Sequence, residues 1–171
     1  MPVSNLESRI SDLDGRQVSR RPGVWPALVI LLASGVPVPP VGGLDVNPPL
    51  ATGTLVIAGR VRVTVEVARS SVEQIRGLSG RPDLKRGHGM LFVYDRPQPV
   101  SIWMKDMRFP LDILWIRGGR IVKIEKRAPP LDPNGPERTY TATADLVLEV
   151  PAGFTDRERI HLGDTVRTAL P

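Results

Sequence analysis

Apolar and polar residues alternate along several short segments of the chain after residue 53, as they do in strands that bury one face. The clearest segment is 61–67, where four valines alternate with polar side chains. The same reasoning predicts strands at residues 54–58, 89–94, 101–104, 111–116, 120–126, 146–150 and 165–168. Gly118 and Gly119 separate two of these segments, and glycine pairs favour the tight turn of a β-hairpin.

One short helix interrupts this pattern. Ser70 and Glu73 have the spacing of a capping box, and Gly77 is a typical helix-ending residue, so a helix is predicted over residues 71–76. We therefore expect a β-rich α+β domain over residues 54–171, with about seven short strands and one or two small helices. The sheet is expected to curl, or to form a barrel, because closure protects its edges.

The first third of the chain has a different character. A polar leader (residues 1–23) precedes an apolar segment (residues 24–35), and a Pro- and Gly-rich segment (residues 36–53) predicts an extended linker. The apolar run is shorter than the roughly 20 residues of a membrane span, and Arg20 and Arg21 stand just before it. We expect an export signal or membrane tether at residues 24–35, and hence a location at the cell envelope. A buried core segment in a cytoplasmic protein is the alternative.

Composition narrows the chemistry. The chain has no cysteine, so disulfides, thiol catalysis and cysteine-ligated zinc are excluded. His88 and His161 have no metal-ligand spacing, and no cofactor-binding motif is present, so no metal and no cofactor are expected. The net charge of +5 is spread among acidic residues, without a basic stripe carrying stacking aromatics, so no nucleic-acid partner is expected.

The segment 101–106 carries the strongest candidate site. Trp103 and Met104 stand directly before Lys105, and Asp112 interrupts the apolar strand 111–116. A buried carboxylate is costly unless it has a partner, so we expect Asp112 to pair with Lys105 or Arg76. A structural ion pair, with the aromatic and sulfur side chains in the core, would give the same sequence.

Two further segments bear on this site. Met90 and Phe92 lie in the strand 89–94 and are expected to belong to the core or to form the wall of a pocket, and Gly89 beside them allows the chain to approach another group closely. Glu149 alternates with Leu148 and Val150, which predicts a side chain on the solvated face of its strand.

Several short motifs occur in an order that resembles the family named domain of unknown function 192, over about residues 54–169. They are Arg76-Gly77-Leu78, Gly89-Met90-Leu91-Phe92, Trp103-Met104-Lys105-Asp106, Pro110-Leu111-Asp112-Ile113, Leu148-Glu149-Val150 with Gly153, and Gly163-Asp164. The resemblance implies a compact β-rich α+β domain of a kind often made with an export signal, and it implies no biochemical role. The family usually has Asn at the position of Asp106 and an apolar pair at Ser79-Gly80.

The residues favour a non-catalytic module that binds a small molecule or a protein. Its pocket would be walled by aromatic and sulfur side chains and would present a few convergent polar groups. The predicted ligand-binding residues are Arg76, Met90, Phe92, Trp103, Met104, Lys105 and Asp112. One alternative is a small hydrolase or lyase with Asp112 or Asp106 as general base and Lys105 as electrostatic stabiliser. The other is a structural interaction module without a pocket.

Overall fold

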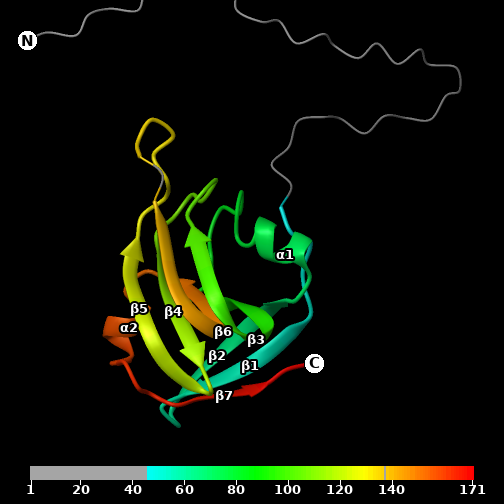
Figure 1. The fold of residues 1–171 in the computed structure, drawn as a ribbon, viewed down its shortest axis with the longest axis vertical. Helices are drawn as coiled ribbons and strands as arrows, with labels where there is room; N and C mark the ends of the chain where they lie inside the picture. Colours follow the sequence, from blue (N-terminus) through cyan, green and yellow to red (C-terminus); the bar gives the residue numbers. More distant parts are fainter. Residues whose placement is uncertain (1–45, 137) are drawn as a thin grey trace, which may run out of the picture. The chain divides into compact units, whose positions relative to one another are not determined.

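The computed structural model describes residues 46–136 and 138–171, and these form a curled sheet with two small helices (Figure 1). The predicted leader, the apolar segment and the linker up to residue 45 lie outside the described residues. The elements are β1 (Thr52–Ile57), β2 (Val61–Ala68), α1 (Ser71–Arg76), β3 (His88–Trp103), β4 (Leu111–Arg117), β5 (Arg120–Ala128), β6 (Thr139–Pro151), α2 (Phe154–Arg157) and β7 (Val166–Ala169).

All seven strands belong to one sheet, in the order β5-β4-β6-β3-β2-β1-β7. Neighbouring strands are antiparallel except for β2 and β3, which α1 connects in parallel. The ends of the sheet approach each other, because the segment before β7 bonds β5: Ile121 N–H donates to the Asp164 carbonyl at 3.0 Å, and Gly163 N–H to the Ile121 carbonyl at 2.8 Å. The predicted curled, β-rich α+β architecture is thus confirmed.

Both faces of the central strands are buried. Leu91 and Leu148 belong to a core cluster on one face, together with residues of β1, β2 and β7. Phe92, Val147 and Trp115 pair across β3, β6 and β4 and belong to a second cluster on the other face. A strand in the middle of this sheet therefore has no solvated face, and alternation along it separates two cores.

Two strands are longer than the sequence pattern indicated. β3 continues through Pro97 and Pro99, with a register shift between Val93 and Gln98, and β6 already begins at Thr139. The prolines are tolerated because β2 pairs with β3 only as far as Phe92, so residues 98–103 pair with β6 alone. Proline is compatible with such an edge, where one side of the strand needs no ladder hydrogen bond.

Helix α1 covers the place where β2 ends. Its capping box is present as predicted: Glu73 N–H donates to Ser70 Oγ at 3.3 Å, and Ser70 N–H to Glu73 Oε2 at 2.9 Å. Asn47 Nδ2 donates to the carbonyls of Glu73 and Gly77 at the end of the helix, and Gln74 Nε2 donates to the Val93 carbonyl at 2.9 Å. These bonds fix α1 against β3.

Candidate functional site

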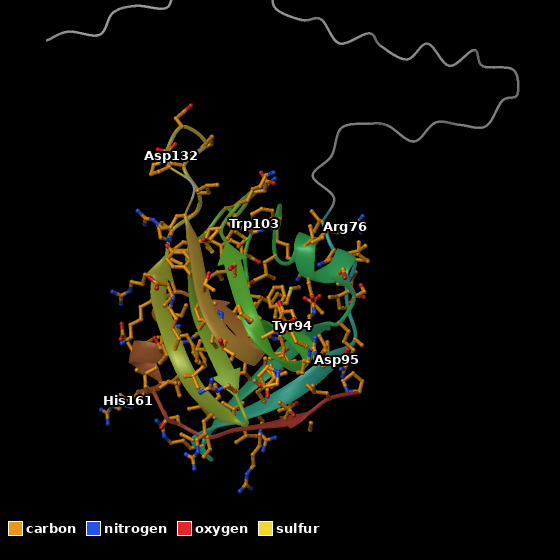
Figure 2. All side chains as sticks on the ribbon, in the orientation of Figure 1. Arg76, Tyr94, Asp95, Trp103, Asp132 and His161 are labelled. Carbon is orange, nitrogen blue, oxygen red and sulfur yellow. The ribbon has the colours of Figure 1, made fainter. Side chains whose placement is uncertain are left out.

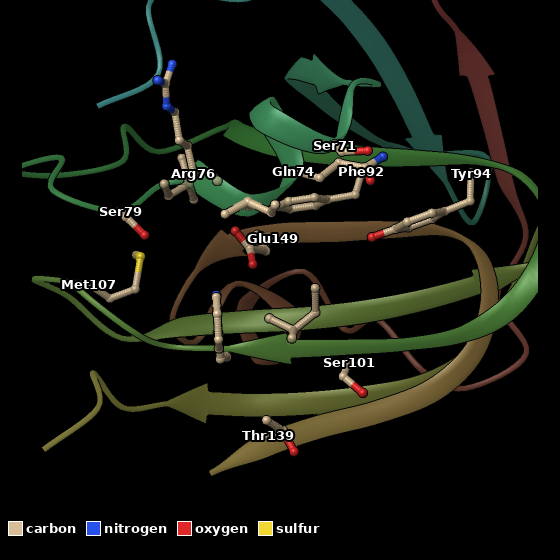
Figure 3. A pocket seen from close by; sticks show the side chains of 15 residues that line it. Ser71, Gln74, Arg76, Ser79, Phe92, Tyr94, Ser101, Met107, Thr139 and Glu149 are labelled. Atoms are coloured by element: carbon tan, nitrogen blue, oxygen red, sulfur yellow. The ribbon is translucent and has the colours of Figure 1, made fainter. Parts of the chain in front are cut away.

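A pocket of about 380 Å³ lies between α1 and the sheet (Figure 3). It forms beyond the point where β3 stops pairing with β2. Helix α1 and the turn that follows it form one wall. The lining combines six apolar side chains with hydroxyl groups, one amide group, one guanidinium group and one carboxyl group. They come from residues 71–79 (Ser71, Gln74, Ile75, Arg76, Gly77, Leu78, Ser79), from β3 (Phe92, Tyr94, Ser101, Ile102, Trp103), from Met107, and from β6 (Thr139, Glu149).

The carboxyl group belongs to Glu149, which is only 5 % exposed. Glu149 pairs with Met90 of β3 and Ile113 of β4, both fully buried, so all three side chains share the face that α1 covers. The predicted solvated side chain is wrong, because both faces of β6 are covered at this point. Among the described residues no group donates a hydrogen bond to Glu149, and burial raises its pKa to about 8.

Two aromatic side chains lie on one side of this carboxyl group. Figure 3 shows the Glu149 carboxyl projecting into the pocket, with Phe92 and Tyr94 on one side and Ser79 and Met107 on the other. The pKa of Tyr94 is raised, first by burial and then by the nearby charge of Glu149. At neutral pH the pocket therefore presents a carboxylic acid that is mostly protonated and an uncharged phenol.

Hydrogen bonds between loops fix the wall next to Ser79. Its Oγ donates to the Lys105 carbonyl at 3.0 Å, and Gly80 N–H donates to the Asp106 carbonyl at 2.9 Å. Asp106 has φ 57°, in the left-handed region, where Asn and Asp are the most frequent residues other than glycine. The turn that follows Trp103 is thus held against the turn that follows α1.

Three of the seven predicted site residues line the pocket: Arg76, Phe92 and Trp103. Trp103 is 51 % exposed, whereas Phe92 is buried. Figure 2 places Arg76, Tyr94 and Trp103 on the part of the domain near α1, and His161 on the far side near α2.

Two other predicted residues are core residues. Met90 is fully buried in the cluster beneath the pocket. Met104 is 2 % exposed and contributes to a smaller cavity of about 220 Å³ beside the loop between β5 and β6. The side chains of Met90 and Met104 thus do not line the main pocket.

Lys105 lies at the surface, outside the pocket lining. Its ammonium group lies 5.8 Å from the centre of the Trp103 ring, close enough for a cation–π contact. Asp106 is also exposed and outside the lining. Lys105 thus contacts Trp103, whereas the hydrogen bonds of Asp112 come from Arg127, Gly153 and Thr155.

Asp112 has a different role from the predicted one. It is fully buried, and its carboxylate accepts hydrogen bonds from Arg127 N–H at 2.9 Å, Gly153 N–H at 3.0 Å, Thr155 N–H at 2.9 Å and Thr155 Oγ1 at 2.7 Å. It pairs with Val150, on the face opposite Glu149. This corrects the predicted pairing with Lys105: Asp112 ties β4 to β5 and to the start of α2, away from the pocket.

Gly89 allows the sheet to close beside Glu149. A Cβ atom at this position would lie 2.6 Å from the Glu149 carbonyl oxygen and 3.1 Å from Leu148 Cδ1. The predicted close approach at Gly89 is therefore confirmed, and the approaching backbone is that of β6.

The sequence interpretation missed Glu149 and Tyr94 as pocket residues. A signal for Glu149 was present, because an acid interrupts the apolar run 146–150 just as Asp112 interrupts the run 111–116. No such signal exists for Tyr94, because the pattern of residues in its strand does not indicate that this side chain lines a pocket.

The described residues give two further observations about possible sites. Among residues 46–136 and 138–171, no three His, Asp or Glu side chains are grouped so that they could hold a metal ion. Within the same ranges, no helix has the length and apolar character that crossing a bilayer requires.

Comparisons with known proteins place this geometry in a family. Residues 54–168 match the model of domain of unknown function 192 (DUF192), described as "Uncharacterized ACR". A structure described as a "putative transcription regulator" from Sinorhizobium meliloti 1021 is 29 % identical, with a TM-score of 0.65, over 71 % of this chain and 97 % of that chain. A protein of unknown function from Novosphingobium aromaticivorans DSM 12444 is 31 % identical, with a TM-score of 0.63, over 72 % of this chain and 91 % of that chain.

No curated protein matches the chain. The family match covers most of the described domain, and both solved structures share its fold at about 30 % identity. The chain belongs to the DUF192 family.

Proposed function

We propose that this protein is a non-catalytic binding domain that takes a small organic molecule into the pocket between α1 and the sheet. The observation that carries the proposal is a buried carboxyl group, Glu149, that has no hydrogen-bond partner among the described residues and faces an apolar, aromatic-walled pocket. The Glu149 oxygens are not sealed in the core but accessible from the pocket, so a polar group of a ligand can pair with them.

The pocket has the properties of a ligand site. Its volume of about 380 Å³ lies within the usual range for sites that bind small molecules. Apolar walls supply affinity, and a few polar groups such as Glu149, Tyr94 and Ser79 supply orientation. A structural module without a pocket, which the sequence left open, fits these features less well.

A catalytic role for Asp112 or Asp106 has little support from the geometry. Asp112 already accepts four hydrogen bonds, and Asp106 lies at an exposed turn outside the pocket lining. Glu149 is the only acid that lines the pocket among the described residues, and no His or Lys side chain lines it. Ligand binding therefore accounts for the arrangement with fewer assumptions than hydrolysis or elimination does.

The test compares two variants that each remove one exposed apolar side chain. Trp103 lines the pocket and is 51 % exposed, and Leu162 is 65 % exposed and outside the pocket lining. The full chain is screened by thermal shift against a panel of small aromatic and aliphatic molecules, and binding molecules are measured by calorimetry. We expect Trp103→Ala to weaken binding at least tenfold and Leu162→Ala to leave it unchanged. Molecules that bind both variants equally well would refute this site.

A further inference from the structure

We propose that the ligand is an organic cation: an amine-bearing molecule whose ammonium group pairs with the Glu149 carboxylate and whose apolar body packs against Phe92, Tyr94 and Trp103. This inference rests on the proposed binding function and adds the chemical class of the ligand. It is carried by the position of the carboxyl group, by the charges around it and by the aromatic walls.

Asp112 and Glu149 differ in their hydrogen bonds. An ionised carboxylate accepts up to about four hydrogen bonds, and those on Asp112 are all used, whereas Glu149 has none from the described residues. An ammonium group brings up to three N–H donors and a compensating charge. A ligand that only accepts hydrogen bonds could accept one from the O–H group of protonated Glu149. The remaining lone pairs of the Glu149 carboxyl group would then stay without a donor.

The titratable groups that line the pocket beside Glu149 come from β3 and α1. From β3 the titratable group is Tyr94, and from α1 it is Arg76, whose guanidinium points away from Glu149 in Figure 3. From β4 the paired residue is the apolar Ile113, and the neighbouring Asp112 lies on the opposite face. Burial raises the pKa of Glu149, and none of the ion pairs recorded among the described residues involves this carboxyl group.

The aromatic side chains of the pocket wall also favour a cation. The faces of aromatic rings attract cations, most strongly when water is excluded. Phe92, Tyr94 and Trp103 all line the pocket, and the Trp103 ring already has the Lys105 ammonium 5.8 Å from its centre. An ammonium group entering beside these rings would meet both a counter-charge and favourable ring faces.

The proposal predicts how binding depends on pH. Because Glu149 must lose its proton to pair with a cation, and its pKa in the empty pocket is about 8, affinity for an amine should rise about tenfold per pH unit from pH 6 and level off near pH 8. An amine probe with a pKa near that of a lysine side chain, roughly 10, stays charged throughout this range.

The experiment uses the full chain and three matched probes: 2-phenylethylamine, the neutral 2-phenylethanol and the anionic 3-phenylpropanoate. Dissociation constants are measured from pH 6 to pH 8.5 by ligand-detected NMR for the wild type, Glu149→Gln and Trp103→Ala. We expect the amine to bind most tightly at pH 8. We also expect Glu149→Gln to remove the rise with pH, to weaken the amine at least tenfold at pH 8, and to leave the alcohol within about twofold.

The outcomes separate the two proposals. If the alcohol or the propanoate binds in a Trp103-dependent way at least as tightly as the amine, or if amine binding is the same at pH 6 and pH 8, the cation proposal is overturned and the pocket remains a binding site. If no probe binds in a Trp103-dependent way, the cation proposal falls as well, and the broader screen described above decides the function. A melting curve of Glu149→Gln at pH 6 confirms that the variant is folded.

Discussion

Two acids, Asp112 and Glu149, each interrupt an apolar strand, and they lie on opposite faces of the sheet in different environments. Asp112 is enclosed by four donors, so its cost of burial is offset within the chain. Glu149 has no such donors among the described residues and faces the pocket. Both acids stand out in the sequence, but the sequence interpretation placed Asp112 in the binding site. The donors to Asp112 are three backbone N–H groups and the Thr155 hydroxyl, all more than ten residues away along the chain, so the sequence does not reveal them.

The turn at Asp106 shows a substitution that the backbone explains. The resemblance to the family suggested Asn at this position, and the observed φ of 57° is compatible with both Asn and Asp. The change from Asn to Asp therefore alters the charge of an exposed turn and preserves its geometry. The side chain lies outside the pocket lining, so ligand preference is not expected to depend on it.

Replacing Glu149 by Gln should change how stability depends on pH. The pKa of Glu149 is about 8 in the folded protein and near 4.5 when exposed, so below about pH 4.5 both states hold the proton and stability is unaffected. As pH rises from 4.5 to 8, only the unfolded state releases this proton. The free energy of unfolding therefore falls by up to roughly 4 kcal/mol. Above pH 8 the loss levels off.

Glu149→Gln removes this loss, so the variant should gain stability over the wild type between pH 5 and pH 8 by several kcal/mol on this scale. Urea unfolding of both proteins at pH 5, 6.5 and 8 measures the difference. If the free energies of unfolding of the two proteins differed by the same amount at all three pH values, the carboxyl group would titrate normally and would not be buried as described.

Local patterns predicted the elements well wherever a strand or helix is defined by its own residues. The capping box at Ser70 and the Gly118-Gly119 hairpin are present, with φ of 57° and 71° at the two glycines. The outer half of β3 was expected to break at its prolines and instead continues, because its edge position there depends on where β2 ends. The early start of β6 was missed because it pairs with that same half of β3.

The joint between β4, β5 and α2 should depend on Asp112. Replacing it with Ala leaves three backbone N–H groups and the Thr155 hydroxyl without their acceptor. We expect Asp112→Ala to lower the free energy of unfolding by about 3 kcal/mol or more, measured by chemical denaturation.

The matched control is Asp132→Ala, in the loop between β5 and β6, where the carboxylate is exposed and accepts one bond from Asn134 N–H (Figure 2). This control should change stability by no more than about 0.5 kcal/mol. If Asp112→Ala were as stable as Asp132→Ala, Asp112 would not hold the joint.

At the scale of the molecule, alternation and turn residues were sufficient to predict a curled β-rich domain, and the family match confirms the resemblance. The sequence interpretation named Arg76, Phe92 and Trp103 of the pocket lining and missed Glu149 and Tyr94. The place of these two depends on how α1 lies over β3 and β6, which are far apart in the sequence. The export signal or membrane tether at residues 24–35, and with it an envelope location, stays a prediction from the sequence.

The most direct test of this account is a carbon-13 NMR titration of the Glu149 side-chain carboxyl in the full chain, with the resonance assigned from its loss in Glu149→Gln. The account predicts a pKa near 8 in the ligand-free protein, and a clear decrease when 2-phenylethylamine is added. A ligand-free pKa close to 4.5 would contradict it, because the carboxyl group would then be hydrated or already paired within the chain.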